Sequence, residues 1–511
     1  MAVVLILLAG RPAEAELRLA GIFGDHMVLQ RDRAIPVWGW ADAGARVTVS
    51  LSGRTTTAVA GDDGRWRAAL PALPAGGPFT LAATATPVAG SVSAVTCTNV
   101  LLGDVWVCSG QSNMEWPVGQ CRNAAEARQE ARFPQIRHIA IPTHSPASLR
   151  EDRYNLAVHP QDDMPPAKWV VCSPDTVGEF TAVGYFFGRE LHKAVGVPIG
   201  LINASWSGTR IEPWTPAEGF AATPELAEIQ RQVQDADPIY RSAVTKAVSA
   251  IEQWLPSARQ AVSSGRLPAA PPAWPIHALD SPKAPTSIYN AMIHPLLPYA
   301  IRGAVWYQGE SNRGDTQYLA KMKALIGGWR AAWGQGDFPF YYVMLAPGGH
   351  GGQDPIVWEG QRLALAIPRT GMAVTADIGG DLHPANKEDV GKRLALWALA
   401  QEYSRTNLVY MGPLYKAMRV DGDRVRLEFD HVGGGLASRD GQPLTWFTIA
   451  GTNRSFTAAT AVMDGDTVLV SSPRVKAPVA VRFAWSGETG VKPNLMNKEG
   501  LPAAPFRTDC W

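Results

Sequence analysis

The middle of the chain, from residue 101 to residue 401, alternates short apolar runs with helical patterns, and this alternation restricts the possible folds more than any other feature. The helical patterns cover Thr181–Ala194, Thr316–Trp333 and Asn386–Ala400. The apolar runs have the length of buried strands: Val105–Cys108, Ile199–Asn203, Ala304–Tyr307, Phe338–Leu345 and Met372–Ala376. Such alternation predicts an α/β fold whose parallel sheet is covered by helices on both faces. Ligands of these sheets bind just beyond the carboxyl ends of the strands.

Both ends of the chain have a different texture, which predicts β-rich domains over residues 16–100 and 402–511. Alternation with period two occurs at 46–51 and at 424–429, and turn sequences containing Asp-Gly separate the strand-like runs. Residues 214–285 interrupt the middle domain with a charged helical stretch, 224–261, followed by a proline-rich tract, 268–285. We expect this insertion to be either a lid or a spacer.

Composition and the first residues restrict partners and compartment. The 511 residues contain 47 Lys and Arg against 46 Asp and Glu, so no overall attraction to nucleic acid or to an anionic membrane is expected. An apolar run at 2–9 precedes Ala13-Glu14-Ala15, which predicts a truncated signal peptide over residues 1–15 and a periplasmic or secreted protein. The alternative is a buried first strand. No other stretch approaches the roughly 20 apolar residues of a membrane span.

The five cysteines carry little information on their own. They show no CxxC spacing, which argues against a zinc ribbon. In an exported protein one or two disulfides could form, with one thiol left over, and the sequence alone does not pair the cysteines. The sequence makes no prediction of the oligomeric state.

Polar clusters follow the first two strands of the predicted sheet. Ser112 lies in SGQSNMEWP at 109–117, on a glycine-containing turn where a nucleophile can protrude; the alternative is a hydrogen-bonding turn residue. Gly208 lies in NASWSGTR at 203–210, where its N–H could face a developing oxyanion, although most glycines at such a place only form turns.

Two further clusters follow later strands. QGESN at 308–312 offers the amide of Gln308 or Asn312 to an oxyanion, or forms a hydrogen-bonded loop. DIGGDLHP at 377–384 supplies Asp381 and His383, which could act as a general base and its orienting carboxylate. Four polar clusters after four strands of one parallel sheet are difficult to explain by packing alone.

The order Ser, Gly, Gln/Asn, Asp–His resembles that of the SGNH hydrolases. Three segments are similar to the sialate O-acetylesterase-like carbohydrate esterases: LLGDVWVCSGQSNMEW at 101–116, AVWYQGESN at 304–312 and DLHPANKEDVGKRL at 381–394. Further similar segments reach into both β-rich ends, so the resemblance covers nearly the whole chain. It implies a flavodoxin-like three-layer α/β/α hydrolase domain flanked by β-sandwich, jelly-roll-like segments.

By this resemblance Ser112 is the nucleophile, His383 the base and Asp381 its orienting partner. The implied oxyanion hole consists of the Ser112 N–H, the Gly208 N–H and the Gln308 amide, with Asn312 as the alternative. Asp377 is a rival for Asp381, because SGNH enzymes usually have the carboxylate three residues before the histidine and here the spacing is two.

The resemblance implies removal of acetyl groups from O-acetylated oligo- or polysaccharides through an acetyl-serine intermediate, on sialic acids or on hemicelluloses such as xyloglucan or xylan. No cofactor and no metal is implied, and the sequence contains no HExxH motif. Arg210, Glu310 and Trp116 are the expected substrate-binding residues; alternatively, Arg210 and Glu310 pair with each other. The rival functions are a non-catalytic carbohydrate-binding protein on the same fold and an esterase for non-sugar acyl esters.

Overall fold

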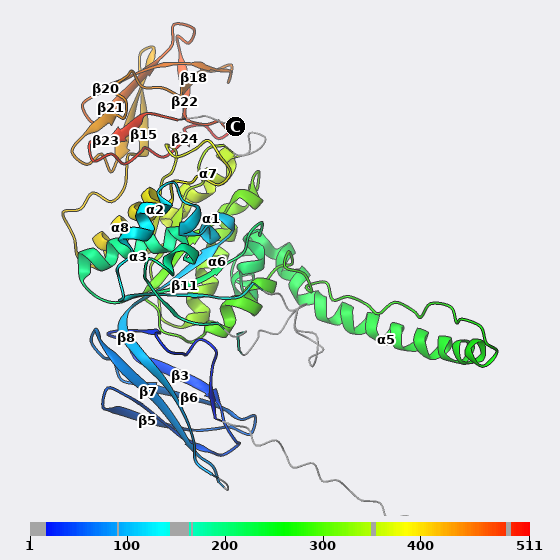
Figure 1. The fold of residues 1–511 in the computed structure, drawn as a ribbon. Helices are drawn as coiled ribbons and strands as arrows, with labels where there is room; N and C mark the ends of the chain where they lie inside the picture. The colour runs from blue at the N-terminus through cyan, green and yellow to red at the C-terminus, as the bar shows by residue number, and fades with distance from the viewer. Residues whose placement is uncertain (1–16, 89–90, 144–162, 165–166, 349–353, 487–491) are drawn as a thin grey trace, which may run out of the picture.

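The computed structural model describes residues 17–511 except 89–90, 144–162, 165–166, 349–353 and 487–491. The predicted signal peptide, residues 1–15, lies outside this part of the chain. The described residues form an α/β body with β-rich parts at its two ends (Figure 1).

A predominantly parallel sheet forms the centre of the body, as the alternation of apolar runs and helical patterns predicts. Its strand order is β10-β9-β11-β8-β12-β13-β14, and only β10 runs antiparallel to its neighbour on this path. The strands are β8 (Ser93–Gly110), β9 (Ile136–Ala140), β10 (Val170–Val171), β11 (Ile199–Ser205), β12 (Gly303–Tyr307), β13 (Phe340–Val343) and β14 (Thr370–Ala373). From β8 the chain first builds the β9 side and later the β12 side, so the residues after β8 emerge where the sheet changes direction.

Aromatic contacts show that helices cover both faces of this sheet. On one face Trp106 of β8 meets Phe187, and Tyr341 of β13 meets Trp397. On the other face Trp306 of β12 meets Trp329. The helices of the body are α1 (Ser112–Glu115), α2 (Ala124–Glu130), α3 (Ala182–Val195), α4 (Ala217–Ala221), α6 (Tyr318–Trp333), α7 (Asp354–Leu363) and α8 (Lys387–Glu402). Both α3 and α8 therefore lie on the Trp106 face, and α6 lies on the opposite face.

Strand β8 joins the N-terminal β-rich part to the body, so the predicted boundary at residue 100 falls inside a single strand. Its first half pairs with β7 and β2, and its second half pairs with β11 and β12. The strands of this part are β1 (Arg18–Leu19), β2 (Val28–Gln30), β3 (Ile35–Trp40), β4 (Arg46–Leu51), β5 (Arg54–Val59), β6 (Arg65–Leu70) and β7 (Gly76–Thr86). Alternate residues of β6 are buried and exposed, as expected for a sheet with one face in the core.

The C-terminal β-rich part has a hydrophobic cluster separate from that of the body. Its sheets have the orders β15-β16-β21-β20, β19-β18-β22-β24 and β17-β23. The strands are β15 (Leu414–Asp421), β16 (Arg424–Asp430), β17 (Leu436–Ser438), β18 (Phe447–Gly451), β19 (Phe456–Ala458), β20 (Thr460–Asp464), β21 (Thr467–Ser471), β22 (Pro478–Phe483), β23 (Leu495–Asn497) and β24 (Phe506–Arg507).

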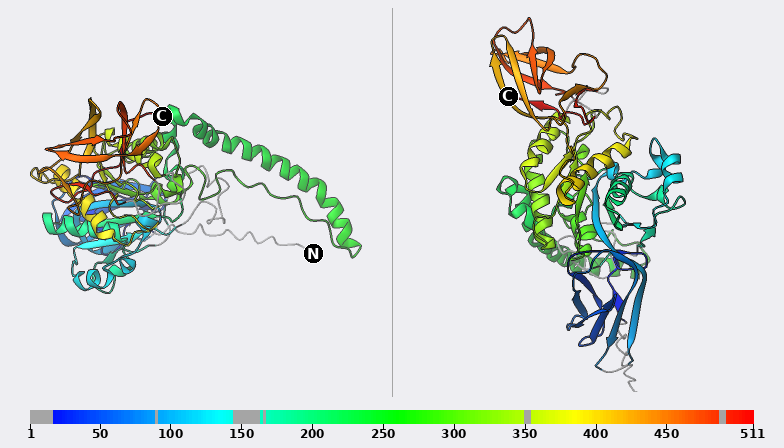
Figure 2. Two further views of the ribbon diagram at one scale, coloured as in Figure 1. Left: turned by 90° about the horizontal axis from the view of Figure 1, so that it is seen from above. Right: turned by 90° about the vertical axis from the view of Figure 1, so that its left-hand side faces the viewer.

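A long helix, α5 (Ala227–Ser263), leaves the body as an arm (Figures 1 and 2). It lies where the charged helical stretch is predicted, and the chain returns toward the body without regular secondary structure through the proline-rich tract. No helix in the described residues is both long enough and apolar enough to cross a membrane.

No disulfide joins the cysteines in the described part of the chain. All five cysteines lie in the described part of the chain and all five are free. Four of them are buried and only Cys510 is exposed. The buried thiols act as small apolar core residues, which is common for free cysteine.

Candidate active site

The turn that carries Ser112 is built on a close contact between β8 and β12. Gly110, the last residue of β8, has a φ of +141°, and a Cβ added there would lie 2.1 Å from the Tyr307 carbonyl oxygen. Only glycine fits this position without displacing β12. The Gln111 N–H donates to the same carbonyl at 3.0 Å, and α1 begins at Ser112. Ser112 therefore emerges, half-buried, at the carboxyl end of β8.

The structure brings Ser112 and His383 together, although they are far apart in the sequence. The Nε2 atom of His383 lies 2.8 Å from the Ser112 Oγ. Trp116 stacks on the imidazole with a centroid distance of 5.0 Å and an interplanar angle of 21°. Burial and the positive charge of Lys387 lower the pKa of His383, while Asp381 raises it. A lowered pKa leaves the ring neutral at neutral pH, so Nε2 can accept a proton from the serine.

Neither of the two aspartates considered as partners hydrogen-bonds to the imidazole within the described residues. Asp381 is exposed, and its Oδ1 accepts a long hydrogen bond, 3.4 Å, from the His383 backbone N–H. Asp377 binds the Arg393 guanidinium through both oxygens, each at 2.7 Å. Asp381 thus lies beside the histidine without contacting its ring, and Asp377 is bound to α8.

The predicted amide donors of the oxyanion hole point elsewhere in this structure. Gln308 is buried, and its Nε2 faces Asn312 Oδ1 at 2.8 Å, Thr209 O at 3.1 Å and Gln111 Oε1 at 3.2 Å. Asn312 is also buried; its amide nitrogen donates to Glu212 and Asp315. Periodicity and composition do not reveal where an amide points, so the sequence could not exclude this arrangement. Both amides bind the loops beneath Ser112 to one another.

The other two predicted oxyanion donors are the backbone N–H groups of Ser112 and Gly208. Within the described part of the chain, neither the Ser112 N–H nor the Gly208 N–H donates to a protein acceptor. Gly208 is exposed and has a φ of +72°. The Trp206 N–H donates to the Gly110 carbonyl at 3.0 Å, which fixes the turn after β11 next to the turn after β8. Gln308 supports the same turn through the carbonyl of Thr209.

Arg210 belongs to a compensated ion network rather than to a pair with Glu310. Its guanidinium contacts Glu212 at 3.0 Å, Asp315 at 3.1 Å and the Ser311 carbonyl at 3.1 Å. Lys321 contacts the same two carboxylates, at 2.8 and 2.6 Å. Burial raises the pKa of Glu212, but the bonds from Arg210 and Lys321 outweigh burial and bring it to about 2.

Asn113, Glu310 and Lys387 form a second polar group, which the sequence analysis missed except for Glu310. The Asn113 amide nitrogen donates to Glu310 Oε1 at 2.5 Å and to the Leu382 carbonyl at 3.0 Å, and its oxygen accepts from the Lys387 ammonium. Glu310, expected to bind substrate, thus faces inward to Asn113. The sequence signal for Asn113 and Lys387 was their position in the motifs. Asn113 directly follows Ser112 in the motif at 101–116, and Lys387 lies in the motif at 381–394.

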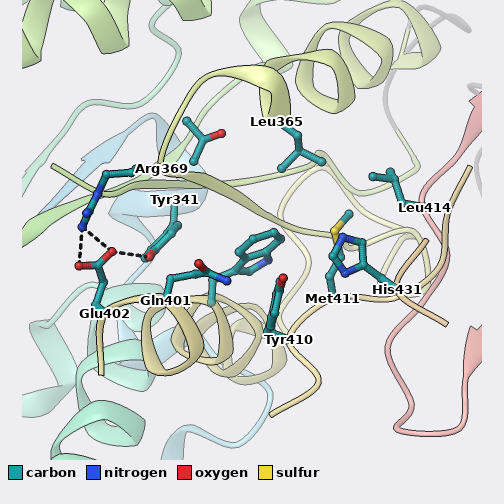
Figure 3. A pocket seen from close by; sticks show the side chains of 11 residues that line it. Tyr341, Leu365, Arg369, Gln401, Glu402, Tyr410, Met411, Leu414 and His431 are labelled. Carbon is teal, nitrogen blue, oxygen red and sulfur yellow. Dashed lines mark hydrogen bonds and ion pairs between the residues drawn. The ribbon is translucent and has the colours of Figure 1, made fainter. Parts of the chain in front are cut away.

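The body also contains a cavity of about 430 Å³ that is separate from Ser112 (Figure 3). It lies at the C-terminal end of α8, where Glu402 pairs with Arg369 at 2.6 Å, whereas Lys387, which contacts Asn113, begins the same helix. None of the predicted site residues lines it. Its lining residues are Tyr341, Leu365, Arg369, Thr370, Trp397, Gln401, Glu402, Tyr410, Met411, Leu414 and His431.

Comparisons with known proteins place the chain among carbohydrate esterases. A family model described as "Carbohydrate esterase, sialic acid-specific acetylesterase" matches residues 265–399. A carbohydrate acetylesterase from Xanthomonas citri, XAC1771, has a solved structure similar to this one, with 36% identity, a TM-score of 0.79, and coverage of 97% of this chain and 100% of that chain.

Two curated relatives extend the match along most of the chain. The sialate O-acetylesterase of Rattus norvegicus is 31% identical over 82% of this chain and 80% of its own length. That of Homo sapiens is 31% identical over 80% and 76%. The protein is therefore a carboxylic ester hydrolase of the carbohydrate esterase class. The chain belongs to the sialate O-acetylesterase family.

Proposed function

We propose that this protein removes acetyl groups from O-acetylated sugars by serine catalysis. The observation that carries the proposal is the 2.8 Å contact between Ser112 Oγ and His383 Nε2 at the carboxyl end of β8. A serine is a weak nucleophile until an adjacent base can take its proton, and a neutral imidazole at this distance is such a base. The family to which the chain belongs supplies the reaction class.

In the proposed reaction His383 takes the hydroxyl proton while Ser112 Oγ forms a bond to the acetyl carbonyl carbon. The oxyanion of the tetrahedral intermediate accepts hydrogen bonds from the Ser112 and Gly208 N–H groups. The intermediate collapses, the sugar oxygen leaves, and His383 returns the proton to it. Water, activated by His383, then attacks the acetyl-serine, and acetate leaves from a regenerated serine.

The substrate class has two candidates within this proposal, an O-acetyl sialic acid and a neutral acetylated hemicellulose. The curated relatives are named for sialate esters. Recognition of the sialate carboxylate would need a cationic side chain whose donors are free, but Arg210 is already bound to two carboxylates. The arrangement therefore argues against Arg210 as the residue that binds a substrate carboxylate. Equal losses on sialate and xylo-oligosaccharide acetates in Arg210→Ala would support this view.

The remaining expectations from the sequence are part of the same proposal. We propose the SGNH type of α/β/α layering for the body and a β-sandwich type for both β-rich ends. The periplasmic or secreted location depends on residues 1–15 alone.

The test is acetate release from acetylated xyloglucan oligosaccharides, acetylated xylan and O-acetyl sialic acid. Ser112→Ala should lower turnover by at least about 10³-fold, to the residual level that binding and the oxyanion donors provide. Ser242→Ala, at an exposed serine of α5, is the matched control and should retain full activity. Full activity in Ser112→Ala would refute the proposal. Sugar binding without acetate release from any substrate would instead support a carbohydrate-binding protein.

A further inference from the structure

The positions of Ser112 and His383 are connected by one side chain, that of Asn113. Asn113 follows Ser112, and it donates to the carbonyl of Leu382, the residue before His383, at 3.0 Å. It is almost fully buried, and its remaining polar capacity is used by Glu310 and by Lys387. Each contact comes from a different segment: the loop after β12, the loop before α8, and α8 itself.

This connection matters because no aspartate holds the imidazole ring in the described residues. In a serine hydrolase a carboxylate on the second ring nitrogen normally orients the base. Here Asp381 contacts only the backbone N–H of His383 and Asp377 is bound by Arg393. The ring is instead fixed by Trp116 on one face and by the backbone that Asn113 holds.

Lys387 occupies a place that stability alone does not explain. Its side chain is fully buried, and the ammonium lies 5.6 Å from the Trp116 ring and 5.4 Å from the Tyr307 ring. It is also the first residue of α8, where the helix dipole disfavours a positive charge. A buried cation is costly unless it is paired, and the carboxylate opposite it is Glu310, reached across Asn113.

We propose that Asn113 and Lys387 are positioning residues for His383, in addition to the serine–histidine pair itself. Asn113 fixes the His383 loop against the Ser112 turn, and the Lys387 charge keeps the imidazole in its neutral, proton-accepting form. The inference rests on the proposed function, because it concerns the base of that reaction.

The charged groups around the base set the direction of the expected effect. Lys387 and Asp381 face His383 with opposite effects on its pKa, which burial also lowers. Glu310, Cys121 and Asp381 face Lys387, whose own pKa burial lowers to about 8. Lys387 is therefore protonated at the acidic pH values at which His383 titrates. Removing its charge raises the pKa of His383, so more alkaline solution is needed to obtain the neutral base.

The size of the shift follows from the shared contact with Trp116. His383 and the Lys387 ammonium lie 5.0 and 5.6 Å from that ring, so they are at most about 11 Å apart. At this separation Lys387→Met should move the acidic limb of kcat/KM upward by about 0.3 to 1 pH unit. Lys387→Arg, which keeps the charge, should return the limb toward its original position. Lys392→Met, at an exposed lysine of the same helix, should not move it.

Two further variants complete the test. Glu310→Gln removes the carboxylate opposite Lys387. Because burial raises the pKa of Glu310, this variant should shift the acidic limb downward by less than Lys387→Met shifts it upward. Glutamine is nearly isosteric with glutamate, so we expect this variant to fold, and its pH profile can test the inference even if Lys387→Met does not fold. Asn113→Ala should lower kcat at least about tenfold with a much smaller change in KM, because a misplaced base weakens the chemical step more than binding.

The outcomes separate the inference from the proposed function. If wild type releases acetate, Ser112→Ala does not, and folded Lys387→Met keeps the wild-type limb, the positioning role of Lys387 is refuted while the serine mechanism stands. If Ser112→Ala is as active as wild type, the proposed function itself fails. Opposite shifts in Lys387→Met and Glu310→Gln, with the Lys392→Met limb unchanged, would establish the electrostatic role.

Discussion

Glu212 is the centre of the ion network beneath the loops after β11 and β12, and Glu212→Gln should remove a pH-dependent part of the stability. The carboxylate contacts Arg210 at 3.0 Å and Lys321 at 2.8 Å. Its side chain is only 11% exposed, so solvent screens these interactions weakly. Burial acts to raise its pKa, and the two cations bring it down to about 2 from an ordinary 4.5.

The magnitude follows from the difference between the folded and unfolded chain. A carboxyl whose pKa falls from 4.5 to about 2 on folding stabilises the folded state by about 3 kcal/mol at neutral pH. The unfolded chain takes up this proton near its ordinary pKa, whereas the folded protein takes it up only near the lowered one. The stabilisation is therefore complete above the unfolded pKa and is lost as the pH falls toward 2.

The assay is urea unfolding of wild type and Glu212→Gln, followed by tryptophan fluorescence, from neutral pH down to about pH 3. The free energy of unfolding should differ by about 3 kcal/mol at neutral pH, and the difference should shrink on acidification. Glu218→Gln, at an exposed carboxylate of nearby α4, should follow the wild type throughout. A difference that stays constant with pH, or that grows toward acid, would refute the argument.

Two more predictions concern the turn and the loop that carry the serine and the histidine. Gly110→Ala should lower the unfolding free energy by about 2–4 kcal/mol and reduce acetate release, because its Cβ would lie 2.1 Å from the Tyr307 carbonyl oxygen at a φ of +141°; an unchanged melting temperature would contradict the close contact. Asp381→Asn should reduce kcat less than about tenfold, whereas Asp377→Asn should mainly lower the melting temperature by breaking its pair with Arg393. A loss near 10⁴-fold in Asp381→Asn would mean that this carboxylate reaches the ring during the reaction.

The sheet and the main helices could be predicted from the sequence because they depend on local periodicity. The apolar runs at 105–108, 199–203 and 304–307 all lie inside strands of the parallel sheet, and the helix predicted at 386–400 is α8. The continuity of β8 across residue 100 could not be predicted in this way. It depends on which strands pair with each half, and pairing is a property of the folded chain.

Predictions for the site depended on the same distinction between local pattern and tertiary contact. Ser112 and His383 were found because each follows a strand in a motif, and the structure places them 2.8 Å apart. The direction of the Gln308 and Asn312 amides could not be predicted, because the residues that hold them come from two other segments, the turn after β8 and the loop after β11. Lys387 was missed for a similar reason, since a lysine in the first turn of a helix is normally solvated.

The two polar groups beside Ser112 have a common structural cause. Parallel strands end side by side, but the loops that follow them share few backbone hydrogen bonds, so the distance between a serine after β8 and a histidine before α8 is not fixed by the sheet alone. Glu212 and Asp315 join Arg210, after β11, to Lys321 on α6, while Asn113 joins the turn after β8 to the His383 loop. Burial strengthens both groups of contacts and also makes each of them expensive to leave incomplete. Burial raises the pKa of Glu310, whereas the pKa of Glu212 is about 2, so acidification should neutralise Glu310 beside Asn113 first. Protonation of Glu212 should loosen the loop after β11 only near pH 2, well below the pH at which protonation of His383 stops acetate release.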